Sequence, residues 1–200
     1  MKSIVIDTSN KYLIVSLYED DKLLASYNEE GNKRQSENTI VVLNDLLNET
    51  NTKVLDYDEI IITKGPGSYT GVRVAMTIAK VIAATTNIKV KTVSSLEAYA
   101  GNDKSISIID ARSNKLYYGI YNNGILEKEE GLINIDSFEE FIKDYPGYKV
   151  VGDTNLVNVK EEKIDLGKNI YELSKTIEYE KDVDALVPHY IKDVEAKKIC

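Results

Sequence analysis

Two aspartates are placed where they could do metal-dependent chemistry on nucleotide phosphates. Asp7, followed by Thr8, and Asp110 each end an apolar segment and begin a polar turn. Carboxylates that face each other across a cleft can hold a hydrated Mg²⁺ beside phosphates. The alternative is that each Asp hydrogen-bonds the turn that follows it. The turns, residues 8–11 and 111–114, lack the glycine that brings backbone N–H groups to an anion, which favours the structural interpretation.

A glycine-rich loop at residues 65–71, Gly-Pro-Gly-Ser-Tyr-Thr-Gly, is a more specific signal. It joins a predicted buried strand to a predicted helix, whose first N–H groups and dipole favour an anion. It is not a Walker loop, because Gly71 is followed by Val and Arg rather than Lys and Ser or Thr. The candidate anion-binding residues are Gly67, Ser68, Thr70 and Arg73. A tight strand–helix connection, with Ser68 or Thr70 as the N-cap, explains the loop equally well.

The elements that must position these residues repeat along the chain. The first half predicts strands at residues 3–7, 12–18, 22–28, 59–63 and 90–93, and helices after residue 36, at 70–86 and at 95–100. The second half repeats the opening: residues 105–110 match 3–7, residues 113–121 match 9–18 with one gap, and 124–131 match the third strand. Beyond residue 131 the pattern weakens to a helix at 137–143, a strand at 149–151 and a helix at 169–178.

Duplication is the simplest explanation of this pattern. It predicts an α/β protein of two subdomains, residues 1–101 and 102–200, of which the second is reduced.

The predicted helix at residues 70–86 is apolar in nearly every direction, so both of its sides must be covered. One side can pack on a sheet, but few other elements are left for the second side. Leaving three or four aliphatic side chains in water would forgo roughly 1.5–3 kcal/mol each, which predicts a partner chain. The residues predicted to face that partner are Ile40, Leu43 and Leu47 of the preceding helix and Val72, Ala75, Met76, Ala79 and Ala83. The alternative is that the preceding helix covers this one within the chain.

The composition excludes several classes of site. One histidine, His189, and one cysteine, Cys200, rule out a disulfide within the chain and any site built from two of its histidines. A net charge of −8 makes the chain a poor candidate for binding nucleic acid alone. No apolar run approaches the roughly 20 residues of a membrane helix, and the first residues turn acidic before a signal sequence could develop. We therefore expect a cytoplasmic protein with no membrane partner.

Several motifs together resemble those of the bacterial TsaB family, also called YeaZ. They are Ile4-Val5-Ile6-Asp7-Thr8-Ser9, Gln35-Ser36-Glu37, the glycine loop with Val72-Arg73, Ala79-Lys80, Val93-Ser94-Ser95-Leu96-Glu97-Ala98 and Asp110-Ala111-Arg112. The match is dense over residues 1–121, and later only 151–153 and 188–192 are similar. Gln35 stands where the family commonly has His, which weakens any role carried over to that helix start. Tyr69 and Val72 are milder changes from Phe and Leu.

The resemblance implies an actin/Hsp70/sugar-kinase-like (ASKHA) fold of two RNase H-like βββαβα halves. It also implies a part in making threonylcarbamoyladenosine (t6A) next to the anticodon, on its 3′ side, in tRNAs that read codons beginning with adenine. In that system TsaD transfers the threonylcarbamoyl group, TsaB is its non-catalytic partner, and TsaE is an ATPase that acts on the complex. TsaB pairs with TsaD, or with itself, through its first two helices, here about residues 35–50 and 70–86.

The expected partners are therefore a TsaD-like subunit, a TsaE-like ATPase, tRNA only through the complex, and a second copy when the chain is alone. No metal or cofactor is expected on this chain alone, and ATP or ADP is expected only at the subunit junction. The competing hypothesis is a Mg-ATP-dependent kinase-like enzyme or ATPase that uses Asp7 and Asp110. A peptidase finds no support, because the sequence offers no metal-ligand cluster or activated nucleophile.

Overall fold

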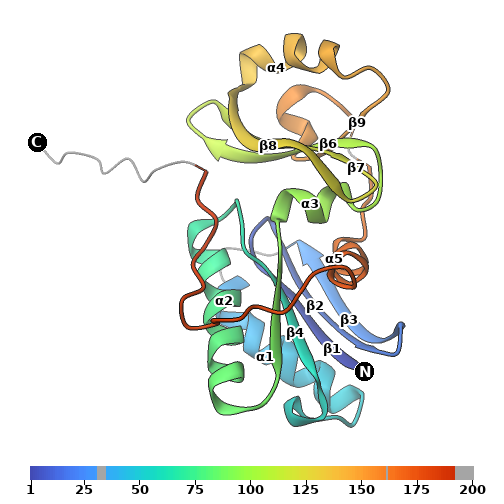
Figure 1. Cartoon of the computed structure of the whole chain (residues 1–200), viewed down its shortest axis with the longest axis vertical. Helices are drawn as coiled ribbons and strands as arrows, with labels where there is room; N and C mark the ends of the chain where they lie inside the picture. Colours follow the sequence, from blue (N-terminus) through green and yellow to red (C-terminus); the bar gives the residue numbers. More distant parts are fainter. Residues whose placement is uncertain (31–34, 161, 192–200) are drawn as a thin grey trace, which may run out of the picture.

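Two β-sheets, one in each half of the chain, organise the computed structural model, which describes residues 1–30, 35–160 and 162–191 (Figure 1). The first sheet has the strand order β3-β2-β1-β4-β5. Its strands are β1 (Lys2–Asp7), β2 (Tyr12–Glu19), β3 (Lys22–Glu30), β4 (Glu59–Thr63) and β5 (Lys89–Val93). The strands β1, β2 and β3 pair antiparallel, whereas β4 and β5 run parallel to β1. This confirms the predicted strands of the first half.

Helices cover both faces of the first sheet, which explains why β1 and β4 are buried almost throughout. On one face, α1 (Gln35–Glu49) and α2 (Tyr69–Thr85) pack over Ile4, Ile6 and Ile60. On the other face, α5 (Leu166–Ser174) packs over Val5 and Ile61, and α3 (Ser95–Ala100) shares this core between α5 and the second half of the chain. A short 3-10 turn, η1 (Val54–Asp56), precedes β4.

The second sheet repeats the first with one strand fewer, in the order β8-β7-β6-β9. Its strands are β6 (Ser105–Arg112), β7 (Lys115–Asn122), β8 (Ile125–Asn134) and β9 (Lys149–Gly152). Again three antiparallel strands are followed by one parallel to the first. The helix α4 (Ile135–Phe141) and the 3-10 turns η2 (Ile142–Asp144) and η3 (Thr154–Val157) complete this half. The predicted duplication, with a reduced second copy, is confirmed.

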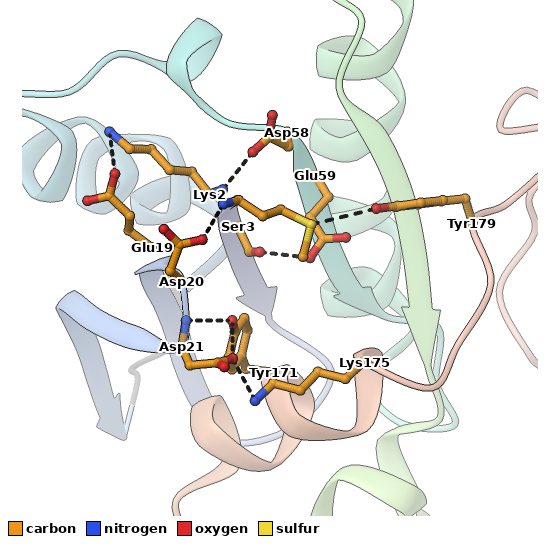
Figure 2. Close-up of polar contacts among 11 residues, drawn as sticks. Lys2, Ser3, Glu19, Asp20, Asp21, Asp58, Glu59, Tyr171, Lys175 and Tyr179 are labelled. Carbon is orange, nitrogen blue, oxygen red and sulfur yellow. Dashed lines mark hydrogen bonds and ion pairs between the residues drawn. The ribbon is translucent and has the colours of Figure 1, made fainter.

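The helix α5 comes late in the sequence but lies against the first sheet (Figure 1). It begins three residues before the predicted start, because Asp165 caps it by accepting a hydrogen bond from Lys168 N at 3.0 Å. Figure 2 shows how α5 is held on the β2–β3 turn: the Tyr171 hydroxyl donates to Asp21 at 3.0 Å, and Lys175 Nζ lies 2.7 Å from the same carboxylate. The predicted boundary after residue 101 falls in the turn between α3 and β6, while α5 rejoins the first half.

Residues 176–191, which we call the strap, run back across β5 and α2 without forming a helix or strand (Figure 1). The Glu180 N–H donates to Val90 O at 2.9 Å, and Lys80 Nζ donates to Asp184 O at 2.7 Å. Val183 and Leu186 pack against the core that α2 shares with the first sheet. The strap therefore supplies cover for α2 that the sequence pattern did not reveal. In the described part of the chain, no helix is long and apolar enough to cross a membrane.

Candidate functional site

Asp7 lies at the end of β1, 1% exposed, with its carboxylate enclosed by hydrogen bonds from its own chain. One oxygen, Oδ1, accepts from the Thr63 hydroxyl at 2.6 Å and from Ser9 N at 2.7 Å. The other, Oδ2, accepts from Asn10 Nδ2 at 2.6 Å. Burial raises the pKa of the Asp7 carboxyl, although these hydrogen bonds lower it in part. The carboxylate thus fixes the β1–β2 turn onto β4, as the structural interpretation predicts.

The glycines of the loop at residues 65–71 admit the β1–β2 turn at very short range. Ser68 N donates to Ser9 O at 2.7 Å, and the Thr8 hydroxyl donates to Gly71 O at 2.6 Å. A Cβ on Gly67 would lie 2.2 Å from Ser9 O, and one on Gly71 would lie 1.8 Å from Thr8 O. Both distances are far inside van der Waals contact, so only glycine fits while the turn stays where it is. The neighbouring turn occupies this side of the loop.

The start of α2 and the second aspartate are also engaged locally. Ser68 is the N-cap of α2, and its Oγ accepts from Gly71 N at 3.2 Å. Thr70 lies inside the helix and is exposed. Asp110 accepts from Arg112 N and pairs with the Arg112 guanidinium, both at 2.8 Å. In the ranges that the structure describes, no three His, Cys, Asp or Glu side chains are grouped so that they could hold a metal.

Six of the eight residues predicted to face a partner are buried within the chain. They are Leu43, Leu47, Val72, Ala75, Met76 and Ala79, each 7% exposed or less. They belong to the core between the two helices and the first sheet, so a partner can reach little of their surface. Ile40 is 55% exposed, and Ala83 is half-buried at the edge of a hollow of about 740 Å³ between α2 and the strap. The surface that α1 and α2 offer to a partner therefore consists largely of other residues.

An exposed stripe does run along the outer side of these two helices. We call it the helix face: Ile40 and Val41 of α1, and Arg73, Thr77, Val81 and Ala84 of α2. The buried sides of both helices pack on the same face of the first sheet, so these residues point away from it. Ile40, Val41 and Val81 are each more than half exposed. The helix face combines three large, solvent-exposed aliphatic side chains with one arginine.

A polar cluster that sequence reasoning missed joins the strap to the second sheet. Glu130 of β8, with a side chain 7% exposed, accepts from the hydroxyls of Ser94 and Tyr121. His189 of the strap lies 3.1 Å from the same carboxylate through Nε2. Burial, and then the charge of Glu130, raises the pKa of the Glu97 carboxyl beside them. The residues of this cluster are spread over positions 94–189, so no local sequence spacing could have predicted it.

The sheet arrangement defines the class of protein. Each half places three antiparallel strands beside a parallel one, and helices lie on both faces of the first sheet and between the two halves. This is the actin/Hsp70/sugar-kinase-like architecture of two RNase H-like halves that the sequence motifs predict.

Comparisons with known proteins identify the family. A family model described as "TsaD: tRNA N6-adenosine threonylcarbamoyltransferase" matches residues 27–155. The tRNA threonylcarbamoyladenosine biosynthesis protein TsaB of Bacillus subtilis (strain 168) is 38% identical over 135 residues, which cover 64% of this chain and 59% of that protein. TsaB of Buchnera aphidicola from Schizaphis graminum is 26% identical over 181 residues, covering 80% and 86%. The crystallised YeaZ from Pseudomonas aeruginosa has a TM-score of 0.75 at 19% identity, with 95% and 100% covered.

This chain belongs to the TsaB (YeaZ) family, within the wider group that the TsaD model describes. Its match spans less than two thirds of the length of the Bacillus subtilis relative. The solved YeaZ structure, at its low sequence identity, supports the fold and nothing finer.

Proposed function

We propose that this chain is a non-catalytic subunit that pairs with a TsaD-like subunit and so permits threonylcarbamoyl transfer to tRNA. The acceptor would be the adenosine 3′ of the anticodon in tRNAs that read codons beginning with adenine. The names of the curated relatives, which are t6A biosynthesis proteins, support this role. The observation that supports a non-catalytic role is that the β1–β2 turn fills the glycine loop, where Gly67 and Gly71 leave room for it.

The same geometry argues against the alternative, a Mg-ATP-dependent enzyme of the actin/Hsp70 class. A phosphate seated at the start of α2 would need N–H groups that Ser68 and Gly71 already use within the chain. A metal held by Asp7 would have to displace three hydrogen bonds from a buried carboxylate. In our proposal ATP or ADP therefore binds, if the complex uses it, at the junction with the TsaD-like subunit.

The helix face supports pairing with another subunit. Covering Ile40, Val41 and Val81 would stabilise a complex by roughly 1.5–3 kcal/mol for each side chain that becomes fully buried. Since the TsaD family model matches this chain, a TsaD-like subunit should offer a similar helix layer, and two similar layers can meet about a pseudo-two-fold axis. A second copy of the chain would use the same face when the partner is missing, which gives the expected homodimer.

The charge of the chain supports a proposal in which other members of the complex bind the tRNA. With a net charge of −8, the chain does not offer the clustered cations that counterion release requires. The TsaD-like subunit should supply most of the positive surface, and a TsaE-like ATPase should act on the assembled complex. All of these partners would meet in the cytoplasm.

Two experiments test the proposal. The chain should co-elute with the TsaD-like subunit of the same organism, and it should restore t6A in a strain depleted of its own TsaB. Val81→Arg, an exposed change on the helix face, should abolish co-elution while the chain stays folded. Ile125→Arg, at an apolar position in the second half that is also more than half exposed, is the matched control and should still co-elute. If the unmodified chain neither co-elutes nor restores t6A, the proposed function is wrong.

A further inference from the structure

The strap brings Tyr190 to the first turns of α2, where it completes an exposed cluster with Tyr69 and Arg73. The two tyrosine rings stack with centroids 5.8 Å apart and an angle of 24° between their planes. The Arg73 guanidinium carbon lies 4.3 Å from the centroid of the Tyr69 ring, and Arg73 Nε donates to the Tyr190 hydroxyl at 3.1 Å. Tyr69 is 49% exposed and Tyr190 is 44% exposed. We call these three residues the Tyr–Arg cluster.

The backbone next to Tyr190 is fixed from both halves of the molecule. The preceding residue, His189, donates its N–H to Lys64 O at 2.7 Å in the first half. Its side chain lies 3.1 Å from Glu130 in the second half. The position of Tyr190 is therefore set by contacts that lie outside the Tyr–Arg cluster.

This arrangement orders three long side chains without removing them from water. Exposed cation–π contacts and exposed hydrogen bonds stabilise a fold only slightly, because water competes for the same groups. The ordering instead has its main consequence for binding, since side chains that are already fixed lose little entropy when a partner arrives. Tyrosine and arginine are also the residue types that most often dominate the binding energy of protein interfaces. The Tyr–Arg cluster has the composition of a binding anchor, and its three side chains already contact one another before a partner arrives.

We propose that the Tyr–Arg cluster anchors the TsaD-like subunit and that the strap is thereby part of the subunit interface. This inference rests on the proposed function. Arg73 belongs to both the cluster and the helix face, so the two surfaces are continuous. Its guanidinium fork matches a carboxylate, which predicts an acidic side chain beside an apolar patch on the partner. An RNA partner is disfavoured, because the cluster holds one cation on a chain of net charge −8.

Two substitutions test the anchor in the full chain. Tyr190→Ala removes the contribution of the strap, and Arg73→Lys keeps the charge but loses the planar fork and its stacking. Each should raise the Kd for the TsaD-like subunit, measured by calorimetric titration, by about 10-fold or more, as expected for an interface anchor. Ile125→Ala, at an exposed position in the second half, should leave that Kd unchanged. Thermal unfolding should be nearly unchanged in all three variants, because each altered side chain is exposed.

Hydrogen exchange separates a lost contact from a detached strap. The amides of Glu180 and His189 are hydrogen-bonded to the first half, so their protection reports whether the strap is in place. Weaker binding by Tyr190→Ala with both amides still protected supports the anchor.

Three results would overturn the inference. In the first, Tyr190→Ala and Arg73→Lys bind the TsaD-like subunit as tightly as the unmodified chain does. This result would refute the anchor and leave the proposed function unaffected. The two variants could lose self-association alone, or tRNA binding alone, which would assign the Tyr–Arg cluster to a different occupant. Finally, an unmodified chain that does not bind the subunit refutes the proposed function and the anchor together.

Discussion

Substituting Gly71 by alanine tests whether the glycine loop exists for folding or for a ligand. Gly71 lies in the first turn of α2, where alanine is ordinarily the better helix former by about 1 kcal/mol. Here, however, the new Cβ would lie 1.8 Å from the backbone oxygen of Thr8. Because a backbone atom cannot rotate away as a side chain can, the β1–β2 turn and α2 must separate. The hydrogen bond from the Thr8 hydroxyl to Gly71 O, at 2.6 Å, would be strained or lost.

The magnitude follows from three opposing contributions. Overpacking costs about 1–3 kcal/mol and sometimes more, and a lost buried hydrogen bond costs about 1 kcal/mol. The gain in helix propensity offsets about 1 kcal/mol of this. We expect Gly71→Ala to lower the free energy of unfolding by about 1–3 kcal/mol, which for a chain of this size is a fall in Tm of about 2–12 °C.

Urea and thermal unfolding of the ligand-free chain provide the assay. Gly167→Ala is the matched control, since this glycine is also helical but its new Cβ would meet a side-chain hydroxyl, that of Ser16, at 2.8 Å. The hydroxyl can shift, so the control should lose less stability than Gly71→Ala. A Gly71→Ala chain at least as stable as the unmodified one would refute the reasoning. It would mean that the turn adapts freely and that glycine is kept for something else, such as an anion.

Two further predictions concern an ion pair of β5 and the contacts of α5, the latter drawn in Figure 2. Lys91→Met should lower the free energy of unfolding by about 3–5 kcal/mol, because it leaves the buried Glu59 carboxylate, 3.2 Å from Lys91 Nζ, without its cation. The double variant with Glu59→Gln, measured in the same urea unfolding experiment, should recover part of that loss. If the double variant recovers nothing, the two groups are not paired. The hydrogen bond and the charge of Lys175 lower the pKa of the exposed Asp21 carboxyl in the folded chain. The ionised carboxylate therefore stabilises the folded chain above the unfolded pKa of about 4, and this stabilisation is lost as the pH falls through the lowered pKa of the folded chain. Asp21→Asn should therefore be less stable than the unmodified chain at pH 7 and converge with it in acid, and a difference that stays constant with pH would argue against the pair.

The duplicated framework could be predicted from the sequence because its signals are local. A short apolar run followed by Asp, a polar stretch and a hairpin occurs twice, and β1 and β6 occupy equivalent places in the two sheets. The second strand, however, continues past Asp110 to Arg112, so Asp110 does not begin the turn as predicted. The glycine loop also predicts the start of α2, with Ser68 as one of two possible caps. The late helix begins three residues earlier than predicted, because a single Asp between Ile164 and Leu166 is a weak sequence signal for an N-cap.

The burial of α2 could not be predicted in the same way. A helical pattern shows that a helix is apolar on several sides, but it does not say which element covers each side. Ala75 and Ala79 were assigned to a partner because no remaining helix or strand was available to cover them. The covering element is partly the strap, an extended segment without periodicity. Its Asp184 carbonyl accepts a hydrogen bond from Lys80 of α2, and its Leu186 packs against the core that α2 shares with the first sheet. Such contacts depend on the path of the chain and leave no pattern in the segment itself.

The candidate site illustrates a related ambiguity of glycine. A glycine admits a close approach of any backbone or ligand, so the loop at residues 65–71 fits an anion and a neighbouring turn equally well. The structure resolves this choice, because the carbonyls of Thr8 and Ser9 stand where the Cβ atoms of Gly71 and Gly67 would be. The hydrogen bonds of Asp7 explain why an aspartate stands there without invoking a metal. Three donors converge on its buried carboxylate, which positions the same turn. Asp7, Thr8 and the glycine loop thus act together to set the β1–β2 turn against the start of α2, whereas Thr70 and Arg73 lie exposed on that helix.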